Sequence, residues 1–205
     1  MSRSTPTLPR IACVGAGYWG RNLVRNFNAL GALAAICEAN PETRTALSTQ
    51  YPGVRCAAHI DEVLADTDIA GVVIATPAET HAALVRRALE AGKDVLVEKP
   101  LCLDATEGRQ LVELAECAGR VLMVGHLLWY HPVVLKLREM IHAGELGRIQ
   151  YVYSNRLNLG RIRREENILW SFAPHDVSVI LGLLGETPDE ISTHCSRYPS
   201  GGAWS

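Results

Sequence analysis

The sequence lacks the features that mark nucleic-acid-binding, membrane and secreted proteins. Its 20 basic and 22 acidic residues give a formal net charge of −2, which leaves no excess of positive charge for nucleic acid or an anionic membrane. No apolar run is long enough to cross a bilayer. Residues 1–10 are polar and contain no apolar core of a signal peptide. We therefore expect a cytoplasmic protein whose partners include neither nucleic acid nor a membrane.

Patterns of metal ligands and disulfides are also missing. No pair of cysteines has the spacing of metal ligands, and the histidines and acidic residues form no fixed cluster, so we expect no metal site. Several cysteines lie in apolar strand or helix patterns, which is typical of reduced, buried thiols in a cytoplasmic protein. The six cysteines are Cys13, Cys37, Cys56, Cys102, Cys117 and Cys195.

What the sequence does contain is a strand followed by a glycine-rich turn. The apolar run 11–14 ends in G-x-G-x-x-G and passes into an expected helix over 21–30. In a dinucleotide site Gly15 makes the tight turn, Gly17 lets the backbone approach a pyrophosphate, and Gly20 lets helix and strand pack closely. Taken alone the motif is weak, because glycine turns also occur where nothing binds.

The context of the motif strengthens it. A second apolar run, 33–37, ends at Glu38, whose carboxylate can accept hydrogen bonds from both ribose hydroxyls of an adenosine. The same charge would repel a 2′-phosphate. The order strand, glycine turn, helix, strand, acid therefore predicts a dinucleotide site that takes NAD in preference to NADP.

Apolar strands and helices alternate through residue 124. Further strands are expected at 54–57, 69–75, 94–97 and 121–124, and helices at 42–50, 61–64, 78–91 and 104–118. This alternation predicts an α/β fold, a doubly wound parallel sheet of the Rossmann type, over residues 1–124. Ligands of such sheets bind at the carboxyl ends of the strands. Glu38, Thr76, Lys99 and His126 all follow strand ends, so we expect one crevice to collect them.

The character of the sequence changes over 125–205. We expect a helix over 132–142, a long strand over 149–159 and a charged loop over 161–167. The segment 170–184 is expected to carry a further helix, which residues 173–176 precede. One more strand is expected over 190–197. These elements make an incomplete α/β (α+β) domain for substrate binding and dimerisation. With 48% hydrophobic residues, the 205-residue chain has enough apolar content for one large domain or one and a half ordinary ones.

Several of these motifs together resemble the Gfo/Idh/MocA oxidoreductase family. The matches are G-A-G-Y-W-G at 15–20, Thr76-Pro77 with His81 in the next helix, Glu98-Lys99-Pro100, Gly125-His126, the 146–149 turn and His175 ahead of the last helix. The resemblance implies an NAD-dependent dehydrogenase that moves a hydride between a sugar hydroxyl carbon and nicotinamide, with Lys99 and His175 as the catalytic residues. It also implies a cis peptide bond before Pro100 and a homo-oligomer for the longer parent of an apparently truncated chain. The implied cofactor residues are Gly15, Gly17, Tyr18, Trp19, Gly20, Glu38, Thr76, Pro77, His81, Glu98, Lys99 and His126.

The segment 154–178 resembles family members that act on nucleotide sugars, UDP-N-acetylglucosaminuronate 3-dehydrogenases of surface-polysaccharide pathways among them. That resemblance implies a nucleotide-sugar substrate held by Arg156, Arg163, Arg164, Asn167, Trp170 and Asp176. A guanidinium matches a diphosphate or a uronate carboxylate bidentately. Its alternative role is an ordinary solvated loop, and for Trp170 the alternative is core packing.

The residues themselves leave alternatives for the proposed chemistry. A lysine beside an oxidised nicotinamide is favoured in its neutral form and can take a hydroxyl proton, whereas most lysines are solvated surface residues. His175 titrates near neutrality and can relay that proton, or it can cap or pack against a helix. For His81, His126 and His131 we expect a structural role or a contact to the ribose in preference to a catalytic role. Ser171 stands where many family members have an aspartate, which leaves a catalytically silent NAD-binding module or interaction subunit as the rival hypothesis.

Overall fold

The computed structural model of the protein describes residues 8–157 and 168–194. The chain forms two compact units, Met1–Gly125 and His126–Ser205. Within the described residues no helix is both long and apolar enough to pass through a lipid bilayer.

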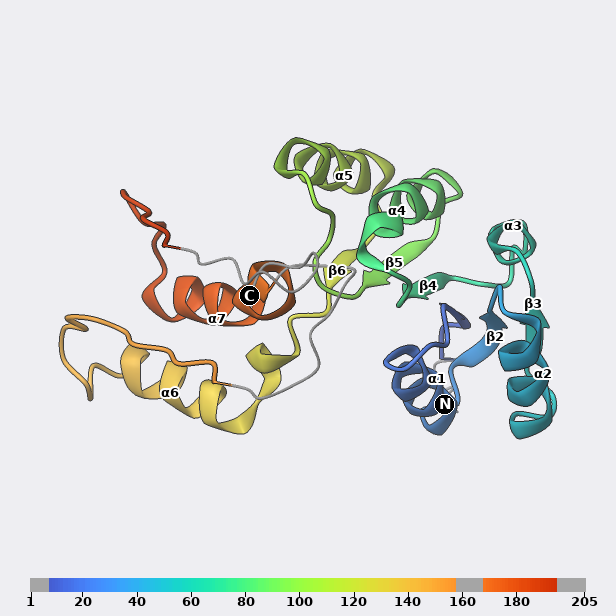
Figure 1. The fold of residues 1–205 in the computed structure, drawn as a ribbon, viewed down its shortest axis with the longest axis horizontal. Coiled ribbons are helices and arrows are strands. Elements are labelled where there is room, and N and C mark those ends of the chain that lie inside the picture. Colours follow the sequence, from blue (N-terminus) through green and yellow to red (C-terminus); the bar gives the residue numbers. More distant parts are fainter. Residues whose placement is uncertain (1–7, 158–167, 195–205) are drawn as a thin grey trace, which may run out of the picture. The chain divides into compact units, whose positions relative to one another are not determined.

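The first unit is a six-stranded parallel sheet with helices on both faces (Figure 1). The strand order is β3-β2-β1-β4-β5-β6, so the direction of winding reverses between β1 and β4. This is the switch point of a doubly wound sheet, next to which such folds bind their ligands. The strands are β1 (Ile11–Val14), β2 (Leu33–Cys37), β3 (Arg55–Ala57), β4 (Gly71–Ile74), β5 (Asp94–Val97) and β6 (Leu122–Val124). The predicted fold class is confirmed.

The helices alternate with these strands as the sequence predicts. They are α1 (Gly20–Ala29), α2 (Pro41–Gln50), α3 (Ile60–Leu64), α4 (His81–Glu90) and α5 (Ala105–Ala118), with a 3₁₀ turn η1 (Ala78–Thr80) leading into α4. Side chains cap two of them: Asn40 Oδ1 accepts from Thr43 N–H at 2.9 Å, and Asp104 Oδ1 accepts from Glu107 N–H at 2.8 Å. Such caps satisfy amide donors that the first helical turn leaves without a partner.

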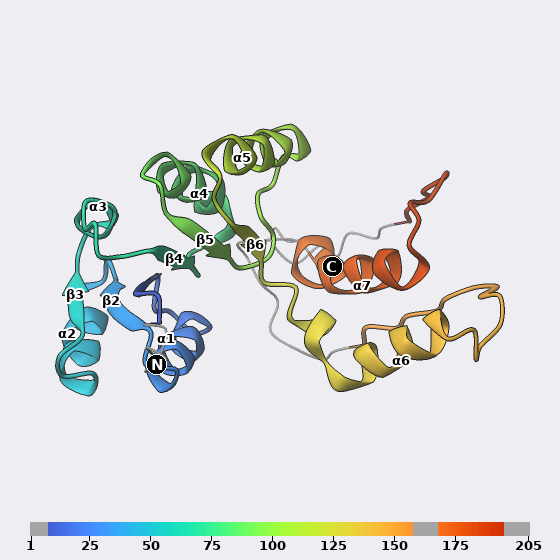
Figure 2. The same ribbon diagram turned by 180° about the vertical axis from the view of Figure 1, so that it is seen from behind.

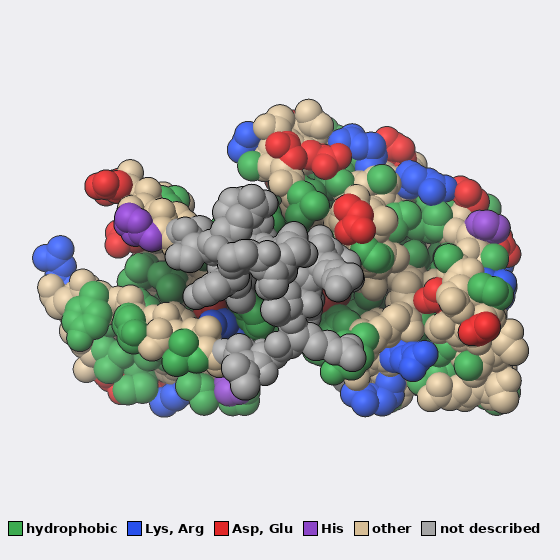
Figure 3. Space-filling view, in the orientation of Figure 1, with side chains coloured by type: hydrophobic (Ala, Val, Ile, Leu, Met, Phe, Trp, Pro, Cys, Tyr) green, Lys and Arg blue, Asp and Glu red, His purple; other side chains and the backbone are tan. Residues whose placement is uncertain are grey.

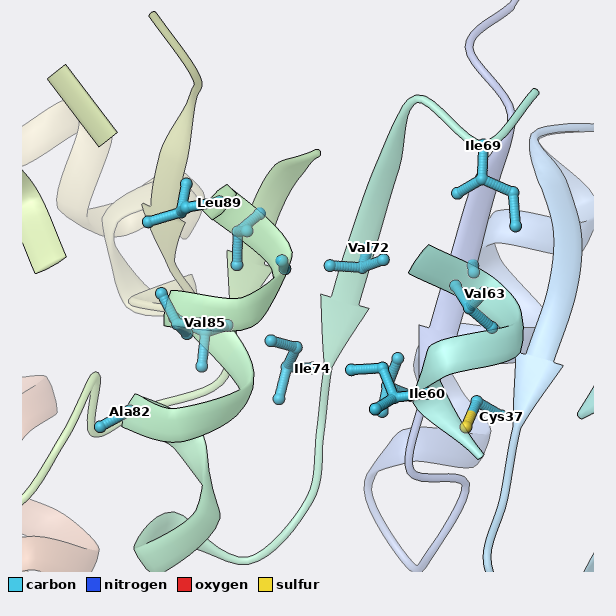
Figure 4. Packing of buried hydrophobic residues seen from close by; sticks show 14 of the residues in the cluster. Cys37, Ile60, Val63, Ile69, Val72, Ile74, Ala82, Val85 and Leu89 are labelled. Atoms are coloured by element: carbon cyan, nitrogen blue, oxygen red, sulfur yellow. The ribbon is translucent and has the colours of Figure 1, made fainter. Parts of the chain in front are cut away.

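Both faces of the sheet are buried, which explains why its strands read as continuous apolar runs. Alternate residues of β4 point to opposite faces: Val72 and Ile74 belong to the core cluster under α3, α4 and α5, while Val73 belongs to the cluster under α1 and α2. Figure 4 shows Val72 and Ile74 between the side chains of α3 and those of α4, such as Val63 and Val85. Charged side chains of both signs lie interspersed over the outer faces of α4 and α5 (Figure 3).

The regular elements among the described residues of the second unit are all helices. They are the 3₁₀ turn η2 (Leu127–Tyr130), α6 (Pro132–His142) and α7 (Ile168–Leu184). Helices α6 and α7 lie side by side in Figures 1 and 2 and contact each other. Trp129 of η2 packs directly on Gly182 of α7, where a Cβ would lie 1.7 Å from the indole ring. Only glycine permits that contact.

Two predicted strands of the second unit are wrong over the residues that can be compared. Residues 149–157 of the predicted strand 149–159 are not in a strand, and neither are residues 190–194 of the predicted strand 190–197. The side chains of residues 151–157 are exposed. A strand is held by hydrogen bonds to a neighbouring strand, and sequence alternation at 149–157 specifies one face without supplying that neighbour.

The boundary of the last helix also differs from the prediction. Residues 173–176 were expected ahead of the helix, but α7 begins at Ile168 and contains them, with Pro174 inside it. An interior proline removes one backbone hydrogen bond and costs roughly 3 kcal/mol. The helix nevertheless continues through Pro174.

Candidate dinucleotide-binding site

The glycine turn follows β1, lies against Ala75 after β4 and leads into α1. Gly15 has a φ of +84°, a conformation that L side chains rarely adopt. A Cβ on Gly15 would lie 2.8 Å from the Ala75 carbonyl oxygen, and a Cβ on Gly20 would lie 2.1 Å from the Gly15 carbonyl oxygen. These two glycines therefore allow the tight turn and the close helix–strand packing for which they were predicted.

Gly17 is different, and its surroundings fit the approach of a dinucleotide. It is exposed, and a Cβ built on it would meet nothing within 4 Å, so the fold itself does not require glycine there. The residue lies just before α1, whose N-terminus carries the positive end of the helix dipole. The backbone of Gly17 is therefore open to the approach of a ligand, as the sequence predicts for a pyrophosphate.

Glu38 follows β2 and reaches the glycine turn. Its Oε2 accepts from Ala16 N–H at 2.8 Å and its Oε1 accepts from Asn40 N–H at 2.9 Å. A carboxylate has about four lone-pair positions, so these two bonds leave capacity for both hydroxyls of a ribose. The sequence located this acid but not its bond to Ala16, which holds the turn and the acid in register.

A hydrogen bond joins Trp19 of the glycine turn to Glu98 of the Glu98-Lys99-Pro100 motif. The Trp19 indole Nε1–H donates to Glu98 Oε1 at 2.6 Å. Gly125 makes room for this carboxylate, because a Cβ there would lie 3.1 Å from its oxygens. In the strand order β1-β4-β5, this bond joins the loop after β1 to the end of β5 across the end of β4. No sequence signal predicts the contact.

The loops after β4 and β5 carry the remaining predicted residues of the first unit. Thr76 Oγ1 and Thr80 Oγ1 lie 2.7 Å apart, and Thr80 Oγ1 donates to the Pro77 carbonyl at 2.7 Å. Lys99 is half-buried after β5. The peptide bond between Lys99 and Pro100 is cis, which confirms that expectation.

His81 makes two structural contacts in the first unit. The side chain is 1% exposed. Its Nδ1 lies 2.6 Å from the Pro100 carbonyl oxygen and its Nε2 lies 2.9 Å from the Thr76 carbonyl oxygen. With both ring nitrogens facing backbone carbonyls, the imidazole presents neither nitrogen to a cofactor.

Most of the other candidates belong to the second unit. His126 precedes η2, and Trp170, His175 and Asp176 lie on α7. Tyr18, 94% exposed, lies in the first unit beside Gly17. The predicted substrate residues Arg163, Arg164 and Asn167 lie outside the residues that the structure describes.

Arg156 and Asp176, both predicted to contact substrate, contact each other. Arg156 Nε donates to Asp176 Oδ2 at 2.5 Å, and Ser154 Oγ donates to Asp176 Oδ1 at 3.0 Å. A guanidinium has five N–H donors, so the ion pair does not exhaust Arg156. It does hold the guanidinium in place and offsets its charge.

The buried cysteines Cys13 and Cys37 are not suited to act as nucleophiles or metal ligands. Burial raises the pKa of Cys13 to about 12 and the pKa of Cys37 to about 11, with the neighbouring carboxylates of Glu62 and Glu38 adding to the latter. Their thiols therefore stay protonated near neutral pH. The five described cysteines are free thiols, and the described residues contain no group of three or more His, Cys, Asp and Glu side chains that could hold a metal ion.

A parallel doubly wound sheet with this glycine turn and a following acid defines the class of dinucleotide-binding α/β proteins. Comparison with known families is more specific. The profile of the oxidoreductase family with an NAD-binding Rossmann fold matches residues 9–126, so the chain belongs to that family and its cofactor is NAD.

The chain is similar to several dehydrogenases. It is 30% identical over 185 residues to a UDP-N-acetylglucosamine 3-dehydrogenase of Acidithiobacillus ferrooxidans, a match that covers 89% of this chain and 56% of the relative. It is 31% identical to an inositol 2-dehydrogenase of Rhizobium meliloti, covering 89% and 57%. The chain thus spans about half the length of the curated relatives it matches.

A solved structure with bound ligands is also similar. The WlbA dehydrogenase of Bordetella pertussis, in complex with NADH and UDP-GlcNAcA, superimposes with a TM-score of 0.65 at 26% identity. That match covers 71% of this chain and 44% of the other.

Proposed function

We propose that the protein is an NAD-dependent dehydrogenase that oxidises a hydroxyl-bearing carbon of a nucleotide-linked sugar in the cytoplasm. The observation that carries the proposal is the set of groups at the carboxyl edge of the sheet. The glycine turn, Glu38 and Lys99 follow β1, β2 and β5 of one parallel sheet. Parallel strands direct the residues that follow them to the same edge, where ligands of this fold bind.

Bound NAD supplies a nicotinamide ring that accepts or releases a hydride. Glu38 accepts from the adenosine ribose hydroxyls, and the Gly17 backbone lies against the pyrophosphate. Lys99 in its neutral form takes the hydroxyl proton of the sugar as the hydride leaves the same carbon, so the C–O bond becomes a carbonyl. His175 receives or relays that proton.

A nucleotide-linked sugar is favoured by the relatives and by the arginine side chain of Arg156 in the second unit. Two of the similar proteins are named for, or hold, a UDP-linked amino sugar or its uronate. Arg156, fixed by Asp176, supplies a guanidinium of the kind that binds phosphate or carboxylate. We assign Arg163, Arg164, Asn167 and Trp170 to the same substrate-binding role. We further propose that the protein forms a homo-oligomer and acts in surface-polysaccharide biosynthesis. The similarity to inositol dehydrogenases makes a free polyol the competing substrate.

A silent NAD-binding module is the second candidate, favoured by Ser171 in place of the aspartate of the resembled family. A hydroxyl does not act as a carboxylate does in orienting or charging a neighbouring histidine. In this case NAD binds and no substrate is oxidised.

The test is the near-ultraviolet absorbance of reduced nicotinamide after mixing the protein with NAD and a substrate panel. The panel contains UDP-N-acetylglucosaminuronate, UDP-N-acetylglucosamine and myo-inositol. We expect the band to grow with a nucleotide sugar. Lys99→Ala should abolish the increase in absorbance while leaving NADH affinity within about threefold, a change of roughly 0.6 kcal/mol. The matched control is Lys136→Ala, which alters an exposed lysine paired with Glu139 in the second unit. If the protein binds NADH but the absorbance does not increase with any substrate, the result supports the silent module. If the absorbance increases with myo-inositol alone, the substrate is a free polyol and not a nucleotide sugar.

A further inference from the structure

The imidazole of His81 connects two loops at the edge of the sheet where NAD binds. One of its carbonyl partners, Thr76, is the second residue after β4, and the other, Pro100, directly follows Lys99 after β5. Strands β4 and β5 are neighbours, with Ile74 opposite Val97. Their last backbone bond runs from Glu98 N–H to the Ile74 carbonyl at 2.9 Å. Beyond that bond, His81 connects the loop after β4 with the loop after β5.

The bond to Pro100 is the one that bears on Lys99. This bond fixes the carbonyl of Pro100, the residue that follows Lys99. The His81 side chain that makes the bond is 1% exposed, and His81 is the first residue of α4. Pro100 is itself buried. A buried carbonyl that loses its donor costs roughly 1–3 kcal/mol, so the loop has little freedom to turn this oxygen elsewhere. The backbone from which the Lys99 side chain extends is thereby anchored to a helix of the core.

The two ring nitrogens can be distinguished chemically. A neutral imidazole carries one N–H and donates to one carbonyl, whereas the doubly protonated ring donates to both. Both observed contacts end on oxygens that can only accept. The hydrogen on Nδ1 therefore decides whether His81 holds Pro100.

We propose that His81 is a positioning residue that sets the location of Lys99 through an Nδ1–H bond to the Pro100 carbonyl. This inference rests on the proposed function, since it deepens the role given to Lys99. The Nε2 contact to the Thr76 carbonyl lies on the loop after β4 and is not what places the lysine.

The chain offers a clean spectroscopic test, because its only lysines are Lys93, Lys99 and Lys136. Labelling with ¹⁵N-lysine gives three backbone amide resonances, and Lys99→Arg identifies that of Lys99. His81→Asn places an amide nitrogen near the position of Nδ1, and His81→Gln places one near Nε2. Both variants remove the ring, so a difference between them reports the bond and not the loss of an aromatic neighbour.

We expect the Lys99 resonance to keep its NAD-induced shift in His81→Asn and to lose at least half of it in His81→Gln. Both variants should lower the melting temperature by similar amounts and leave NADH affinity within about threefold. His142→Asn, which alters an exposed histidine whose Nδ1 also faces a backbone carbonyl at 2.8 Å, should leave the Lys99 resonance unchanged. Equal responses in the two His81 variants, or retention in Gln alone, overturn the proposal.

A second measurement needs no change at His81. In the unmodified protein, ¹⁵N spectra of the histidine rings should show a hydrogen on Nδ1 of His81, the signal being identified by its loss in His81→Asn. A ring found as the Nε2–H tautomer donates only to Thr76 and overturns the proposal. Neither result depends on turnover: absence of NADH binding, or turnover that survives Lys99→Ala, contradicts the proposed function and leaves the His81 geometry to be judged by these spectra.

Discussion

Replacing Gly17 by alanine separates ligand binding from folding in a way that Gly15 cannot. A Cβ at Gly17 meets nothing within 4 Å and its φ lies outside the left-handed region, whereas Gly15 has a φ of +84° and a Cβ there would lie 2.8 Å from both the Ala75 oxygen and Thr76 Cγ2. Gly17→Ala should therefore fold normally. If a pyrophosphate lies against Gly17, the added methyl group occupies part of its place.

The two substitutions are expected to affect the free energy of unfolding differently. Gly17→Ala should leave the free energy of unfolding unchanged or raise it by about 0.5 kcal/mol, since alanine restricts the unfolded chain. Its affinity for NADH should fall at least about tenfold, or roughly 1.4 kcal/mol. Gly15→Ala carries the cost of the left-handed conformation, about 1–2 kcal/mol, and of forcing a side chain into a packed turn, about 1–3 kcal/mol. It should lose roughly 2–5 kcal/mol of stability together with NADH binding.

The assay combines urea unfolding, followed by circular dichroism, with NADH titration of the same samples. The reasoning is refuted if Gly17→Ala binds NADH as tightly as the unmodified protein, because no ligand then approaches that backbone. A large loss of stability in Gly17→Ala would equally contradict the open surroundings seen in the structure.

Two further predictions concern ionisable groups. Backbone N–H groups of His59 and Ala58 donate to Glu62 at 3.0 Å and lower its pKa, so its charge stabilises the fold above the unfolded pKa of about 4.3 and this contribution disappears as pH falls through the lower folded value. The difference in urea midpoint between the unmodified protein and Glu62→Gln should be greatest near neutral pH and vanish in acid; a difference that grows in acid contradicts this. Since the pKa of Cys13 is about 12, only about one in ten thousand of its thiols is ionised at pH 8. Iodoacetamide should therefore modify exposed Cys117 rapidly and Cys13 only in denaturant, as read by peptide mass spectrometry, and early labelling of Cys13 would refute its burial.

Sequence reasoning succeeded where one local pattern determines the structure. The buried runs ending at Val14, Cys37 and Val97 could become only central strands, because both faces of a doubly wound sheet are covered. The roles predicted for Gly15 and Gly20 likewise follow from backbone geometry within a few residues.

It failed where the outcome depends on a partner distant in sequence. The bond from Trp19 to Glu98 spans 79 positions, and the pairing of Arg156 with Asp176 spans 20; neither pair has a pattern that links its members. His81 was located by its motif, but the sequence did not predict the two backbone carbonyls that its ring nitrogens face. The alternation over 149–157 predicts a strand only if another strand pairs with it.

The most direct test of the account is a fluorescence titration of the protein with NADH and, separately, with NADPH. The glycine turn and the Glu38 carboxylate beside Ala16 predict saturable NADH binding in the micromolar range, with NADPH at least about tenfold weaker because its 2′-phosphate meets that negative charge. Equal affinity for the two cofactors would contradict the role given to Glu38. Absence of NADH binding would contradict the site itself.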